Sequence, residues 1–296
     1  MIRAGLTGRR RTWPLAVALC ATFAASPVPA QPPVWVVKDR NSQLVLFGSV
    51  HVLPPGLNWE PPALARALAR ANDLWFELPI DRQAEALTGQ LAVQNGILPE
   101  GQSLLALLGP DDAERLTRVA AAYGLSAPFL DRFQPWLAEI ALAGGAYREA
   151  GATSRTGVEK IIAAAASPKA KLRAFETPEE QIGMLSGGPM PEQLASLRET
   201  LGEMEEDPDA FGALVRAWMA GDVGDLDRQA LAPMRKVAPG LFKRLVMDRN
   251  AAWAAALDAR LKGRGRTVVV VGVGHLVGPG SLPSRLRALG YSVSGP

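Results

Sequence analysis

The chain has 296 residues, of which 48% are hydrophobic and 21% are charged. This composition is typical of globular proteins and excludes an intrinsically disordered chain. The formal net charge is +3, but residues 1–30 contain four Arg and no Asp or Glu, so residues 31–296 carry 28 basic and 29 acidic side chains. Because proteins that bind nucleic acids usually carry a clear basic excess, we expect no nucleic-acid partner.

Residues 1–30 have the layout of a secretory signal peptide. Arg3 and Arg9-Arg10-Arg11 form a basic region, Trp13 to Ala25 form an apolar run, and Val28-Pro29-Ala30 is a small-residue cleavage site. The apolar run is shorter than the roughly 20 residues that a membrane-spanning helix needs. We therefore expect a periplasmic or secreted protein that is cleaved near Ala30 and has no stable membrane insertion afterwards. The alternative is an uncleaved membrane anchor.

The position of the one cysteine limits the reactive groups that the mature chain can carry. The one cysteine, Cys20, lies in the apolar run, so residues 31–296 contain none. This excludes disulfides, thiolate nucleophiles and cysteine-based metal sites from the mature chain.

Hydrophobic patterns predict strands and helices in alternation at both ends of the mature chain. We expect strands at 34–37, 43–47, 73–78, 171–175, 267–271 and 291–293. We expect helices at 62–71, through most of 80–150, at 156–166, through most of 191–262, and at 282–289. The fold class is therefore α/β, with a mixed or mostly parallel sheet, flanking helices and a helical insertion at about 80–150 within one unit, 31–296.

The two histidines of the chain occur in matching contexts. In both places a predicted hydrophobic strand is followed by the pattern Gly-x-x-His, once as Gly48-Ser49-Val50-His51 and once as Gly272-Val273-Gly274-His275. Ligands of open α/β sheets bind at the carboxyl ends of the strands. We therefore expect His51 and His275 to share one functional site.

Glu77 ends another apolar strand, in Asp73-Leu74-Trp75-Phe76-Glu77. With His51 and His275 it completes a set of two imidazoles and one carboxylate. Such sets hold Zn, Mn, Co or Fe and leave positions open for water and substrate. The alternative for Glu77 is a solvated carboxylate on an edge strand.

Four further residues are weaker candidates. Glu159 is either a catalytic carboxylate or a surface neighbour of Lys160, and Glu176 either belongs to the site or caps the helix that follows it. Arg249 and Asn250 either lie on a solvated helix face or act in the site, where they would orient ligands or bind substrate.

Two other kinds of site do not fit. The glycines of Gly272-x-Gly274-x-x-x-Gly278 have the wrong spacing for a dinucleotide-binding loop. Ser49 lacks the Gly-x-Ser-x-Gly elbow of a serine hydrolase. As it lies two residues from His51, we also expect its side chain to point away from the imidazole.

The ordered set of motifs resembles the TraB/GumN family, which is related to the Tiki proteins, metal-dependent proteases. The motifs that carry the resemblance span nearly the whole mature chain: Gly48 to His51, Glu77, Gly157-Val158-Glu159, Glu176-Thr177 with Glu180-Gln181, Trp218 with Gly221-Asp222, Arg249-Asn250, and Gly272 to Gly278. The resemblance implies a metal-dependent hydrolase fold in which His51, His275 and Glu77 match the family's catalytic positions. Glu159 departs from it, because we expect Asp there more often.

These observations together predict an exported metal-dependent hydrolase, with peptides or proteins as substrates. His51, Glu77 and His275 are the expected ligands of Mn, Co or Zn, and Glu77 or Glu159 is the expected general base. Arg249 and Asn250 are expected to bind substrate or stabilise developing negative charge. The alternatives are a non-catalytic periplasmic protein that binds metal, peptide or polysaccharide, and a metal-free esterase that uses the two histidines as acid and base.

Overall fold

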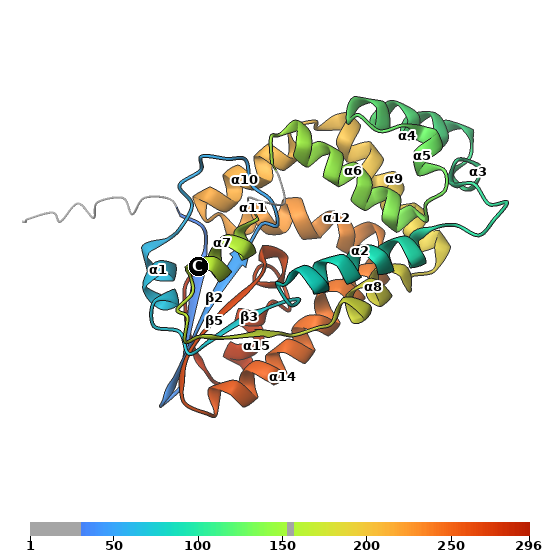
Figure 1. Ribbon diagram of the computed structural model, residues 1–296. Coiled ribbons are helices and arrows are strands. Elements are labelled where there is room, and N and C mark those ends of the chain that lie inside the picture. Colours follow the sequence, from blue (N-terminus) through green and yellow to red (C-terminus); the bar gives the residue numbers. More distant parts are fainter. Residues whose placement is uncertain (1–30, 153–156) are drawn as a thin grey trace, which may run out of the picture.

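A six-stranded mixed sheet forms the centre of the molecule in the computed structural model, which describes residues 31–152 and 157–296 (Figure 1). The strands are β1 (Val34–Lys38), β2 (Ser42–Ser49), β3 (Asp73–Phe76), β4 (Lys171–Ala174), β5 (Gly265–Gly272) and β6 (Ser292–Ser294). Their order is β4-β3-β5-β2-β1-β6. The first four in this order are mutually parallel, and β1 pairs antiparallel with both β2 and β6. The expected α/β class, with a mixed and mostly parallel sheet, is confirmed.

The central strands are buried on both faces. Val268 to Val271 in β5 are each at most 1% exposed, and Leu44, Leu46 and Phe47 in β2 are fully buried. A continuous run of β-branched residues suits this position, because both faces of a central parallel strand meet covering helices. Helices that follow β2 and helices that flank β5 in the sequence pack against these strands.

Helices that surround the sheet come mainly from the second half of the chain. They are α1 (Pro62–Leu68), α7 (Val158–Ala165), α8 (Pro178–Ser186), α10 (Ala210–Ala220), α11 (Val223–Leu226), α12 (Ala232–Val237), α13 (Pro239–Phe242), α14 (Arg249–Leu261) and α15 (Leu282–Ala288). The π-helical segments η2 (Asp227–Leu231) and η3 (Lys243–Asp248) join some of them, and the short 3-10 turn η4 (Val273–His275) follows β5. In Figure 1, α14 and α15 lie together along the side of the sheet.

A second, helical core lies beside the sheet. Its helices are α3 (Leu104–Leu108), α4 (Pro110–Ala122), α5 (Ala127–Leu130), α6 (Pro135–Glu149) and α9 (Met190–Glu206). Leu116 and Leu142 pack there with Leu197 and Leu201 of α9. The helical region expected at 80–150 therefore shares its core with a helix that lies outside that range. The helix α2 (Arg82–Gly96) packs mainly against α8. None of the helices described is long and apolar enough to cross a membrane.

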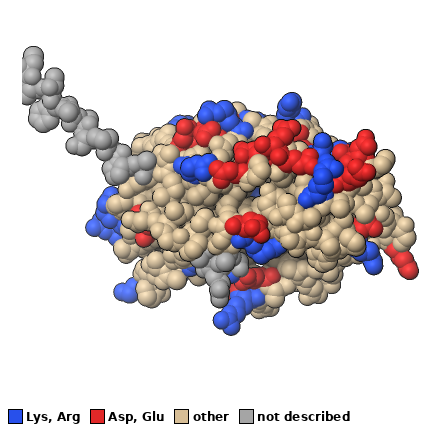
Figure 2. Space-filling model, turned by 90° about the horizontal axis from the view of Figure 1, so that it is seen from above, with Lys and Arg blue, Asp and Glu red and all other residues tan. Residues whose placement is uncertain are grey.

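The face shown in Figure 2 carries charged side chains of both signs between larger areas of other residues. On the face shown in Figure 2, acidic side chains gather towards one end and Lys and Arg are scattered among them. As far as the described residues extend over it, this face has no continuous basic surface of the kind that binds phosphates.

The register of β2 and β5 brings the two Gly-x-x-His motifs side by side. Gly48 lies opposite Val271 and Ser49 lies opposite Gly272. A Cβ added to Gly48 would be 2.8 Å from Cγ2 of Val273, inside the second motif. Gly48 therefore allows a contact between the two motifs that no larger residue would permit. Its carbonyl also accepts a hydrogen bond from Nε1 of the buried Trp218 at 2.7 Å.

Replacement of Gly48 by Ala is expected to destabilise the protein by about 1–3 kcal/mol, because the backbone and Val273 would have to shift. The control is Gly89→Ala in the interior of α2, where an added Cβ meets nothing within 4 Å. That change is expected to stabilise the helix by about 0.5–1 kcal/mol. Urea unfolding measures both, and equal effects of the two substitutions would contradict the packing described here.

Candidate active site

Four adjacent parallel strands end at one edge of the sheet, and each is followed by candidate residues. The sheet order places Glu176 after β4, Glu77 after β3, His275 after β5, and Ser49 and His51 at the end of β2. Residues that are far apart in the chain are brought together because parallel strands place their carboxyl ends at the same edge.

Gly272 lies where three of these side chains converge. A Cβ built on it would be 3.2 Å from Oε1 of Glu77, 3.9 Å from Cδ2 of His275 and 3.9 Å from Cε1 of His51. Nε2 of His275 is 3.8 Å from Oε1 of Glu77. The structure therefore places the three predicted metal ligands around one point.

Glu77 is held as a carboxylate. Its Oε1 accepts a hydrogen bond from the backbone N–H of Gly272 at 2.6 Å, and its Oε2 accepts one from Nη2 of Arg249 at 2.6 Å. Burial alone would raise the pKa of this carboxyl, but His275, Arg249 and His51 lower it to about 2. Glu77 is consequently ionised at neutral pH.

His275 is neutral, and its hydrogen bonds fix its tautomer. Nη1 of Arg249 lies 3.1 Å from Nε2, and because guanidinium groups only donate, Nε2 must accept. The proton is therefore on Nδ1, which donates to Oδ1 of Asn250 at 2.8 Å. Asn250 in turn donates from Nδ2 to the carbonyl of Gly280 at 3.0 Å. Burial is the main cause that lowers the pKa of His275, to about 4.

Arg249 links the ends of β3 and β4. Its Nε and Nη2 donate to the two oxygens of Glu176 at 2.8 and 2.9 Å, a two-point pairing that fixes the guanidinium plane. The guanidinium carbon also lies 4.6 Å from the ring centre of Trp253. The same group contacts Glu77 and His275, so one buried cation orients three members of the site.

Arg249 and Asn250 are 8% and 0% exposed, and their side-chain hydrogen bonds stay within the protein. This placement favours an orienting role over the direct substrate contact that the sequence predicts. The sequence is compatible with two roles for Glu176, a site residue or a helix cap. The cap of α8 is instead a capping box between Thr177 and Glu180, which leaves Glu176 to pair with Arg249.

His51, Ser49 and Glu159 form a second hydrogen-bonded group. Oε1 of Glu159 accepts a hydrogen bond from the hydroxyl of Ser49 at 2.6 Å and lies 3.1 Å from Nδ1 of His51. The hydrogen bond and charge of Glu159 raise the pKa of His51 to about 9, so His51 is protonated at neutral pH. Burial opposes ionisation of Glu159, but its bonds to His51 and Ser49 hold its pKa below the usual value.

The expectation that Ser49 points away from His51 was wrong. Residues two apart on an extended chain share a face, and both side chains contact the same carboxylate. Ser49 is 1% exposed, whereas the His51 side chain is 71% exposed. Ser49 is thus a positioning group for Glu159 that motif comparison alone did not single out.

The donor set partly fits a metal ion. Two imidazoles and a carboxylate suit Mn, Co or Zn, and the fixed Nδ1–H of His275 is the usual arrangement behind a ligating Nε2. The 3.8 Å between Glu77 and His275 is close to the separation of about 3.4 Å between two ligands of a tetrahedral ion. Within residues 31–152 and 157–296, however, no three His, Cys, Asp or Glu side chains are already arranged to hold an ion. Arg249 contacts both Glu77 and His275, and an ion bound by these two residues would have to replace its contact with Nε2 of His275.

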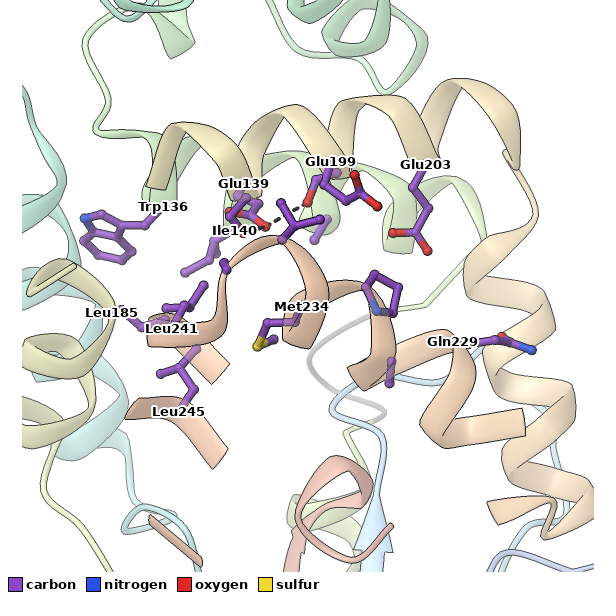
Figure 3. A pocket seen from close by; sticks show the side chains of 17 residues that line it. Trp136, Glu139, Ile140, Leu185, Glu199, Glu203, Gln229, Met234, Leu241 and Leu245 are labelled. Carbon is purple, nitrogen blue, oxygen red and sulfur yellow. Dashed lines mark hydrogen bonds between the residues drawn. The ribbon is translucent and has the colours of Figure 1, made fainter. Parts of the chain in front are cut away.

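An open cleft of about 450 Å³ borders the site. His51, Glu77 and Glu159 line it, together with residues of the β3–α2 connection and of α2 and α7. A separate pocket of about 300 Å³ lies between the helical core and α12–α13 (Figure 3). There Glu199 and Glu203 lie near Met234, and among the described residues that line it none is a candidate catalytic residue.

The model of the TraB/PrgY/gumN family matches residues 33–295. The chain belongs to this family. It is 26% identical over 258 residues to the uncharacterized protein YbaP of Escherichia coli (strain K12). The matched stretch covers 86% of this chain and 92% of YbaP. The YbaP protein of Shigella flexneri matches with the same identity and coverage. No solved structure matches the chain.

The two histidines of the metal-free protein are expected to titrate at opposite ends of the pH range. His275, with a pKa near 4 in the folded chain and about 6.5 when unfolded, takes up a proton on unfolding. Its contribution to the free energy of unfolding is therefore present above pH 6.5 and lost as the pH falls to 4. His51, with a pKa near 9, contributes below pH 6.5 and loses that contribution as the pH rises to 9.

Imidazole NMR titration of chelator-treated protein measures both values, and the His51→Gln variant assigns the two signals. Two signals that both titrate near pH 6.5 would contradict the environments described for these side chains.

Proposed function

We propose that the protein is an exported metal-dependent hydrolase that cleaves peptide bonds. The observation that carries the proposal is the convergence of His51, Glu77 and His275 around Gly272 at the border of an open cleft. The kinship of the TraB/GumN family with metal-dependent proteases supports the choice of reaction. Export rests on residues 1–30, which lie outside the described part of the chain.

His51, Glu77 and His275 would hold Mn, Co or Zn. When bound, such an ion acidifies water and polarises a carbonyl group. Charge balance inside the protein is compatible with this, because Glu77 is already ionised and Nε2 of His275 carries a lone pair. Loading requires that Arg249 move away from Nε2 of His275 and that His51 lose one proton, while Nδ1 of His51 can keep its hydrogen bond to Glu159.

Glu159 is the better candidate for the general base. Both oxygens of Glu77 accept hydrogen bonds, from Gly272 and from Arg249, whereas the two side chains that bind Glu159 in the described part of the chain, Ser49 and His51, both contact its Oε1. Glu159 would accept a proton from the attacking water as its oxygen bonds to the carbonyl carbon. As the C–N bond breaks, that proton passes to the departing nitrogen, which leaves one carboxylic acid and one amine.

Arg249 and Asn250 act as positioning residues in this proposal. Arg249, which Glu176 holds in place, orients Glu77 by a direct hydrogen bond, and Asn250 sets the tautomer of His275. The general effect is that of second-layer contacts in metal enzymes, whose loss typically lowers metal affinity or activity by about 10–100-fold.

A second candidate is metal-free acid–base chemistry on an ester. It is favoured by one observation, which is that Arg249 already compensates the charge of Glu77 and occupies the acceptor nitrogen of His275. In that case His51, with its partner Glu159, would be the proton-transfer group. A non-catalytic binding protein would use the same cleft without turnover.

Hydrolysis of a mixed peptide library by protein that contains residues 31–296 tests the proposal. Activity is expected only after supply of Mn, Co or Zn, and is expected to fall by at least about 100-fold in Glu77→Gln and Glu159→Gln. Glu206→Gln is the matched control, an exposed carboxylate at the end of α9. Activity that survives a chelator would favour the esterase mechanism, and saturable binding without turnover would favour a binding protein.

A further inference from the structure

We infer that the cleft beside the candidate catalytic groups binds an uncharged, apolar side chain of the substrate next to the bond that is cleaved, and that Ile80 is a specificity-determining residue. The inference rests on the proposed function and adds the substrate class. It follows from what lines the cleft and from which of its polar groups are already engaged.

The connection between β3 and α2 supplies both chemistry and an apolar wall. Leu78, Pro79 and Ile80 follow Glu77 directly, and all three line the cleft while remaining partly exposed. Val52, one residue after His51, lines it as well. Apolar surface that is open to water beside reactive groups gains free energy when a ligand covers it, at about 25 cal/mol per Å².

Four polar or charged side chains at the rim of the cleft, Asp81, Thr88, Lys160 and Glu85, already have partners within the protein. Oδ1 of Asp81 accepts the backbone N–H of Ala84 and caps α2, and the Thr88 hydroxyl donates to the carbonyl of Ala84. Nζ of Lys160 lies 3.0 Å from each carboxylate oxygen of Glu85.

The pair of Lys160 and Glu85 joins α7 to α2, the two helices that border the cleft. A charged substrate side chain would lose part of its hydration beside the apolar wall, whereas an apolar one covers that wall and disturbs none of these contacts. The cleft volume of about 450 Å³ lies in the range of about 300–1,000 Å³ that is usual for small-ligand sites.

Blocked alanine peptides with one variable residue, Leu, Ala, Asp or Lys, test the inference. Metal-loaded wild-type protein is expected to cleave beside Leu with a kcat/KM roughly 10-fold or more above that beside Ala, and beside Asp or Lys more weakly still. In Ile80→Asp, the ratio of kcat/KM for the Leu peptide to kcat/KM for the Asp peptide is expected to fall by at least about 10-fold. Ile80→Ala, which adds no charge, is expected to reduce the preference for Leu over Ala.

Leu172→Asp is the matched control, because Leu172 is 57% exposed on the edge strand β4 and lies outside the cleft lining. It is expected to leave the preference unchanged. Cleavage that is indifferent to the variable residue, or an equal preference in Ile80→Asp and wild type, would overturn the inference while the proposed hydrolase stands.

Calorimetric binding of the same peptides separates the two proposals if no peptide is hydrolysed. In that case the proposed function fails. Tighter binding of the Leu peptide, lost in Ile80→Asp and kept in Leu172→Asp, would still support an apolar cleft. Equal binding of all four peptides, or no binding, would contradict it.

Discussion

The guanidinium of Arg249 is the interaction on which the rest of the site depends. It reaches Glu77, Glu176 and His275, which follow three adjacent strands, and it is itself buried against Trp253. Burial of these carboxylates is favourable only with such a partner, and loss of one partner of a buried ion pair typically costs about 3–5 kcal/mol. Arg249 also helps to keep Glu77 ionised, while burial is the main cause that keeps the imidazole of His275 neutral.

Close backbone approach is the second constraint. Gly48 allows the first histidine motif to contact Val273 in the second, and Gly272 leaves the space that Glu77, His51 and His275 share. The glycines of the two motifs thus serve packing as well as chain turning. Strand order completes the arrangement, since β5 lies between β2 and β3 and brings the two ends of the chain together.

Much of this arrangement could be predicted from sequence. The Val268–Val271 run identified the central strand, and the repeated Gly-x-x-His pattern identified both histidines. Pairings between distant residues could not be predicted in the same way. Glu176 and Arg249 are 73 positions apart, and nothing local to either shows that a bidentate ion pair joins them. The position of α9 in the helical core has the same cause, because an apolar helix stripe does not specify which core it enters.

Elemental analysis of purified protein that contains residues 31–296, wild type beside His51→Ala and His275→Ala, tests the central claim that both ends of the chain build one metal site. The account predicts near-stoichiometric Mn, Co or Zn in the wild type and loss of that metal in each variant. A wild type that stays metal-free after exposure to all three ions, or a variant that keeps its full metal content, would contradict it.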